Sequence, residues 1–175
     1  TPNQLTMLRL TGGLAAAGCF AVGSPGWDLA AAALFVIALL LDRADGELAR
    51  LGGKTSSWGH SFDLISDGVC NTAVFIGIGF GLQVGELGSW ALLLGVLAGL
   101  AVTSILWMNL RIEQSEGQRG AELGGVAGFD PDDAILAVPL AMVLGWGVPF
   151  ILAAAIGAPA FAIFYAWYFR AKLVG

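Results

Sequence analysis

Long uncharged segments alternate with short charged ones along the chain. Three of them are each long enough to cross about 30 Å of hydrocarbon as a helix rising about 1.5 Å per residue, namely 10–27, 68–85 and 87–110. The uncharged segment 134–169 is too long for one crossing and is interrupted at Gly145–Pro149, so we expect a helical hairpin there. The uncharged segment 29–41 is too short to cross alone, so its helix must continue into the charged residues 42–50. The pattern therefore predicts six transmembrane helices, at about 5–23, 27–50, 59–83, 88–112, 131–147 and 150–171.

The composition also indicates a membrane protein. Hydrophobic residues make up 57% of the 175 residues and charged residues only 12%, whereas charged residues make up about 25% of an ordinary soluble domain. The formal net charge of −5 provides no basic surface for nucleic acid, which we exclude as a partner. We predict an all-α membrane protein with a single domain over residues 1–175.

The basic residues predict how the helices are oriented. With the six helices placed as above, all eight lie at one end of the bundle: Arg9, Arg43, Arg50, Lys54, Arg111, Arg119, Arg170 and Lys172. By the positive-inside rule, both termini and the longer loops face the cytoplasm, in agreement with an even number of spans. The start of the first helix is less hydrophobic than the rest, so it could lie in the membrane interface before turning inward.

Four aspartates lie where two predicted helices meet the cytoplasmic surface. Asp42 and Asp45 are three residues apart, and Asp63 and Asp67 are four apart, so each pair shares one face of a helix. An aspartate at the centre of a membrane helix costs about 2.5–3.5 kcal/mol, so the group needs a neutralising partner. Mg²⁺ prefers carboxylate oxygens and would supply one. Small residues beside the aspartates leave room for a bulky ligand such as a nucleotide diphosphate: Gly46, Ala49 and Gly59.

The spacing of these residues resembles the signature of a known enzyme family. The stretch Asp42-x2-Asp45-Gly46-x2-Ala49-Arg50-x8-Gly59-x3-Asp63-x3-Asp67 is similar to the motif of the CDP-alcohol phosphotransferases. The opening segment Pro2-Asn3-x2-Thr6-x2-Arg9 also resembles the start of that family's core. The resemblance implies metal-dependent transfer of a substituted phosphate from a CDP-linked donor to an acceptor hydroxyl, with release of CMP. It also implies a homodimer in the membrane, active in the biosynthesis of phospholipids or related phosphodiesters.

The resemblance further implies roles for single residues. Asp42, Asp45 and Asp63 would bind one or two Mg²⁺ or Mn²⁺ ions, and Asp67 would be the general base and could also bind the second metal. The nucleotide would lie against Asp42 and the small residues Gly46, Ala49 and Gly59. Four further residues are candidates for nucleotide contacts, with helix capping or helix-end charge as the alternative: Asn3, Thr6, Arg50 and Ser56. Two cations are candidates for the acceptor, with membrane anchoring as the alternative: Arg111 and Arg119.

Other interpretations stay open at this point. The donor could be CDP-diacylglycerol or a CDP-linked polar head group. Within the family, a synthase that uses CDP-inositol or inositol phosphate is an alternative, although few cations are available to bind an inositol phosphate. Outside the family, the alternatives are an intramembrane prenyltransferase that holds a diphosphate through Mg²⁺, and a small cation transporter.

Overall fold

The computed structural model describes residues 2–51, 57–116 and 135–171, and this part of the chain is helical without any strand. The elements follow one another as α1 (Pro2–Ala21), α2 (Pro25–Leu51), α3 (Ser57–Gly81), the short 3-10 helix η1 (Leu82–Val84), α4 (Trp90–Glu116), α5 (Ala137–Val143) and α6 (Gly147–Tyr168). Each of the six predicted segments overlaps one of the α helices. The expectation of an all-α chain is therefore confirmed for the described residues.

Four of the helices are long and apolar enough to cross a membrane. Their apolar segments are Pro25–Ala44, Ser61–Val84, Trp90–Ile112 and Gly147–Tyr168. Large apolar side chains point away from the protein in these segments, as Leu40 does with 62% of its surface exposed. Lipid would cover such side chains in a bilayer. The chain is thus a membrane protein by the length and composition of these helices.

The first and fifth predicted spans differ from these four. α1 has 20 residues but carries several polar side chains in its first half, and its Thr6 and Arg9 are buried. α5 has only seven described residues, which reach about 10 Å and not across a bilayer. Residues 131–134 of the predicted fifth helix lie outside the described residues. Six spans, cytoplasmic termini and an interfacial start of α1 therefore stay predictions.

The hairpin predicted between the last two helices is present, but its turn is shorter than expected. The turn occupies residues 144–146, where Gly145 has a φ of +73°, a conformation that glycine adopts without strain. Gly147 and Pro149 belong to the first turn of α6 and not to the break. Proline is tolerated there because the first amides of a helix have no partner within the helix.

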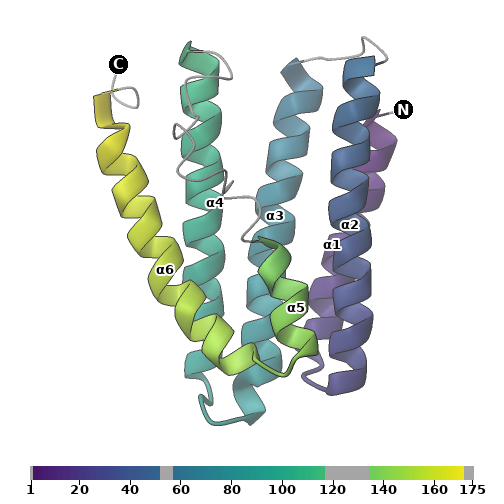
Figure 1. The fold of residues 1–175 in the computed structure, drawn as a ribbon, viewed down its shortest axis with the longest axis vertical. Helices are drawn as coiled ribbons and strands as arrows, with labels where there is room; N and C mark the ends of the chain where they lie inside the picture. The colour runs from purple at the N-terminus through teal and green to yellow at the C-terminus, as the bar shows by residue number, and fades with distance from the viewer. Residues whose placement is uncertain (1, 52–56, 117–134, 172–175) are drawn as a thin grey trace.

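α1 is the element on which both of the next two helices pack. It packs against α2 and α3, α3 packs against α4, α4 packs against α6, and α5 packs against α2. Figure 1 shows the two chain ends, the end of α2 and the start of α3 at the same end of the bundle. The sequence segments that carry the aspartates are therefore brought to the end where both termini lie.

The contact between α1 and α3 depends on a close approach of their backbones. A Cβ atom at Gly77 of α3 would collide with the backbone oxygen of Ala17 in α1. On the opposite side of α3, a Cβ at Gly95 of α4 would collide with the backbone oxygen of Phe75. Small residues allow such close packing of helices inside a membrane, where the hydrophobic effect does not drive helices together.

Two hydroxyl groups strengthen the contact between α3 and α4. The hydroxyls of Thr72 and Thr103 lie 2.6 Å apart, and Thr103 also donates to the backbone oxygen of Gly68 at 3.0 Å. Each hydroxyl thus finds a partner within the protein, as a polar group away from water requires. α3 is thereby fixed between α1 and α4.

We predict that replacement of Gly77 by alanine destabilises the bundle. The added methyl group has no space against the backbone of α1, and overpacking of this kind costs about 1–3 kcal/mol. Thermal unfolding of the purified protein in detergent should show a lower midpoint for Gly77→Ala.

Gly18→Ala is the matched control, because a Cβ at Gly18 meets nothing within 4 Å. This variant should keep or raise the midpoint, since alanine favours helix over glycine by about 1 kcal/mol. Equal midpoints for the two variants would contradict the close α1–α3 contact.

Candidate metal centre

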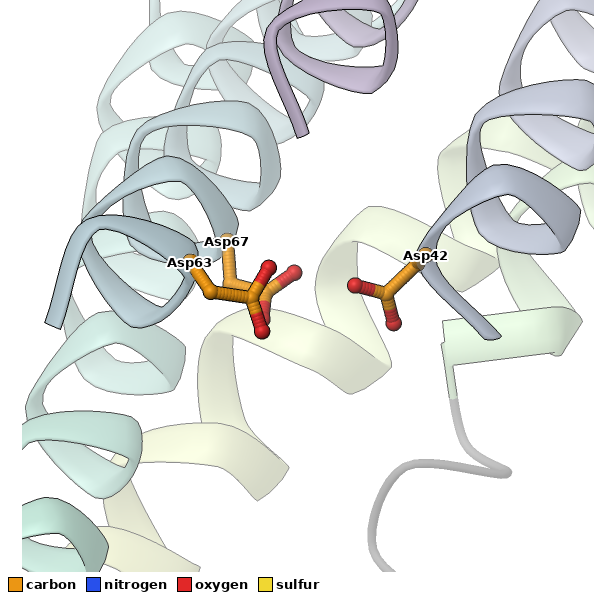
Figure 2. A group of neighbouring side chains, drawn as sticks. All are labelled: Asp42, Asp63 and Asp67. Atoms are coloured by element: carbon orange, nitrogen blue, oxygen red, sulfur yellow. The ribbon is translucent and has the colours of Figure 1, made fainter. Parts of the chain in front are cut away.

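Three carboxylates from two helices converge near the end of the bundle. Asp42 comes from α2, and Asp63 and Asp67 come from α3; one oxygen of each lies within 4.8 Å of the others. Figure 2 shows the two α3 side chains next to each other and pointing toward Asp42. The three side chains are 29–33% exposed, so water and ions can reach them.

The helices place this cluster at one edge of the apolar layer. Asp42 lies two residues before the end of the apolar segment of α2, and Asp63 lies two residues after the start of that of α3. Asp63 and Asp67 are one helical turn apart and share a face of α3. The structure thus brings three of the four aspartates together at one end of the apolar segments. Their roles as metal ligands stay predictions.

The side chain at the centre of the cluster is Arg9 of α1. Its Nη1 pairs with Oδ1 of Asp42, with Oδ1 of Asp67 at 2.8 Å and with Oδ1 of Asp63 at 3.2 Å. Its Nη2 donates a hydrogen bond to the backbone oxygen of Asp63 at 3.0 Å. Arg9 is only 3% exposed. One guanidinium therefore joins α1, α2 and α3.

The positive-inside pattern accounts for Arg9 as a cytoplasmic cation and does not place it in the site. The partners are 33 and more residues away along the chain, so no local spacing reveals the contact. One signal was present: Arg9 is the single charged residue of α1. A lone cation in a helix otherwise free of charge suggests a specific partner in a neighbouring helix.

The donor set fits a hard divalent cation. It consists of carboxylate oxygens, the ligands that Mg²⁺ prefers, and three formal negative charges face the single positive charge of Arg9. Mg²⁺ holds its ligands at about 2.0–2.1 Å, so two oxygens on one ion are at most about 4.2 Å apart. Oxygens that lie within 4.8 Å of one another need to move only slightly to reach this geometry.

A comparison with protein families shows to which family the chain belongs. The family model described as CDP-alcohol phosphatidyltransferase matches residues 1–169. The chain belongs to this family. A comparison with curated proteins gives no match. Membership supports a transferase that takes a CDP-alcohol as donor and an alcohol as acceptor in a bilayer, and this family is typically metal-dependent. The resemblance drawn from the aspartate motif is thereby confirmed.

The other residues that the family motif implicates are placed only in part. Gly59 lies in the first turn of α3, next to the cluster along the sequence, and Thr6 is buried in α1 one turn before Arg9. Arg111 is exposed near the end of α4, where its guanidinium lies 4.5 Å from the ring centre of Trp107. The remaining positions belong to residues or side chains outside the described part: Asn3, Asp45, Gly46, Ala49, Arg50, Ser56 and Arg119. Their roles stay predictions.

We predict that Asp63→Asn weakens Mn²⁺ binding. Changes in the surroundings of metal ligands weaken binding by about 10- to 100-fold, so loss of a direct carboxylate should cost at least about tenfold. Electron paramagnetic resonance of free Mn²⁺ during titration of the detergent-purified protein gives the dissociation constant.

Asp28→Asn is the control, because Asp28 lies in the first turn of α2, at the far end of the same apolar segment. It removes the same charge and should leave Mn²⁺ affinity unchanged. If both variants lose affinity equally, the effect is one of overall charge and the cluster is not the metal site.

Proposed function

We propose that the protein transfers a substituted phosphate group from a CDP-alcohol to the hydroxyl of an acceptor alcohol and releases CMP. The observation that supports this best is the convergence of Asp42, Asp63 and Asp67 at one end of the apolar helices of a chain from this family. The residues that fit a divalent cation are thus three of the four aspartates of the family motif. The reaction belongs to phospholipid or related phosphodiester biosynthesis.

In this proposal Asp42, Asp45 and Asp63 hold one or two Mg²⁺ or Mn²⁺ ions. When bound, the ions stabilise negative charge on the transferring phosphoryl group and on the departing CMP. The carboxylates themselves orient the donor diphosphate by fixing where its oxygens can bind. Three small residues on the same helices leave space for the cytidine: Gly46, Ala49 and Gly59. Four further residues are candidates for nucleotide contacts: Asn3, Thr6, Arg50 and Ser56.

Asp67 is the proposed general base. It lies one turn along α3 from Asp63, and Asp42 is on the other side of the cluster on α2 (Figure 2). A hydroxyl that approaches from the α3 side could give its proton to Asp67 while it attacks the phosphorus opposite CMP. Positioned carboxylates contribute about 10²- to 10⁴-fold in such proton transfers. Arg111 and Arg119 are the proposed contacts for an acidic acceptor.

The site is proposed to face the cytoplasm. The eight basic residues all belong to the end of the bundle that carries the cluster in the six-span topology, and the positive-inside rule assigns that end to the cytoplasm. CDP-alcohols, which are made from cytidine nucleotides, would reach it there. We further propose a homodimer, as the family resemblance implies.

Release of CMP tests the function directly. Purified protein with Mg²⁺ should release CMP with at least one donor–acceptor pair from a panel. The donors are CDP-diacylglycerol, CDP-inositol, CDP-choline and CDP-ethanolamine, and the acceptors are inositol phosphate, glycerol phosphate, serine and lipid alcohols. The active pair identifies the substrates. Absence of both CMP release and metal-dependent nucleotide binding across the panel would refute the proposal.

Asp67→Asn separates the base from the metal ligands. We expect CMP release to fall by at least about 10²-fold, because the asparagine amide cannot accept the proton. Mn²⁺-dependent binding of CMP should stay within a few-fold of the unmodified protein. Equilibrium dialysis with labelled CMP measures that binding, and its loss would show that Asp67 acts chiefly as a metal ligand.

A further inference from the structure

The guanidinium of Arg9 lies at the point where the three carboxylates of the cluster converge. A single nitrogen, Nη1, pairs with Oδ1 of Asp42, Asp63 and Asp67. The side chain reaches this point from α1, a helix that carries no acidic residue. A cation is therefore built into the protein at the place where a metal ion would have to bind.

The arginine nitrogen and a metal ion cannot both occupy the space between these oxygens. An ion that binds Oδ1 of Asp42 and of Asp63 must approach each atom to about 2.0–2.1 Å, and it then lies between the two side chains. Nη1 is within 3.2 Å of Oδ1 of both Asp63 and Asp67, and it also pairs with Asp42. Nη1 therefore occupies the space between these Oδ1 atoms, and an ion that binds the same atoms must displace it.

Arg9 has a second attachment that survives such a movement. Nη2 donates to the backbone oxygen of Asp63, which is not a carboxylate oxygen and is not needed by the metal. The Nε atom is buried and has no hydrogen-bond partner among the described residues. The present position thus leaves one N–H donor of the guanidinium unsatisfied.

We propose that Arg9 is the resident counter-ion of the carboxylate cluster and competes directly with the divalent cation for it. In the absence of metal, Arg9 neutralises the carboxylates and joins α1 to α2 and α3. Metal binding displaces Nη1 while Nη2 keeps Arg9 attached to α3. This inference rests on the proposed function, because it takes the cluster as the metal site. Arg9 is a positioning residue in this scheme.

Competition between Arg9 and the divalent cation predicts that Arg9→Gln binds Mn²⁺ more tightly than the unmodified protein. The variant keeps a side-chain amide but loses the positive charge, so Mn²⁺ should bind more tightly. The gain should be on the order of tenfold or more, because a unit charge that repels the ion at contact range is gone. Arg9→Lys keeps the charge and should bind Mn²⁺ with nearly the original affinity. A merely structural role for Arg9 would predict weaker binding in both variants.

The thermal stability gives a second readout. Without metal, the Arg9→Gln protein should unfold at a lower temperature than the unmodified protein, because its carboxylates have lost their counter-ion. Saturating Mn²⁺ should raise its midpoint by more than it raises that of the unmodified protein. If Arg9→Gln does not fold in metal-free buffer, purification in excess MnCl₂ should recover it, because the metal replaces the missing cation. Failure to recover it would overturn the inference.

Arg170→Gln is the matched control, since it removes a positive charge from the exposed end of α6, where Arg170 lies 5.8 Å from the ring centre of Trp167. Its Mn²⁺ affinity should not change. Unchanged or weaker Mn²⁺ binding in Arg9→Gln would overturn the competition while leaving the metal site in place. Absence of Mn²⁺ binding in the unmodified protein and in Arg9→Gln alike would refute the metal site, and with it this inference.

Discussion

The arrangement of the first three helices depends on a charge balance at the membrane edge. Asp42, Asp63 and Asp67 lie within apolar segments, where carboxylates are costly unless a cation accompanies them. Arg9 of α1 is that cation, and it is almost fully buried among them. If α1 moved away, the carboxylates at the edge of the apolar layer would lose their counter-ion, so α1 cannot leave its place without a replacement for its charge.

The packing between α1 and α3 directs the aspartates toward this arginine. On α3, the residues Asp63, Asp67, Cys70 and Gly77 follow one another at intervals of four, three and seven, which places them on one face. Cys70 lies next to Gly13 and the backbone oxygen of Leu10, and Gly77 lies against the backbone of Ala17. The face of α3 that needs glycine for close contact with α1 is thus the face that carries the acids. Helix packing and charge pairing impose the same rotation on α3.

The sequence was sufficient for features that depend on local spacing. Uncharged segments predicted where the long helices lie, and intervals of three and four predicted that Asp63 and Asp67 share a face. The central place of Arg9 could not be predicted in this way, because it results from the packing of α1 against two helices that are distant in sequence. The positive-inside rule already explains why a cation lies at this end of α1. The rule gives no reason to look for the specific aspartates with which Arg9 pairs.

The fifth helix shows a different limit of sequence patterns. Apolar length predicted a helix over 131–147, and residues 131–134 lie outside the described part of the chain. In the part that is described, the α helix covers Ala137–Val143. Pro139 lies in the first turn of this helix, where a proline removes no hydrogen bond within the helix. Hydropathy predicts whether a segment can lie in lipid, but it does not give the bounds of the helix.

The distribution of acids separates an enzyme at the membrane surface from a transporter. A cation path through the bilayer would be expected to place acidic groups near the middle of the membrane. In the four apolar segments, the acids are Asp28 at one end and Asp42, Asp63 and Asp67 at the other, with none between. The cluster is about 30% exposed and lies within a few residues of the apolar boundary. A site at such a boundary can be reached both from water and from lipid, so the position of the cluster itself favours chemistry at the membrane surface over passage across the membrane.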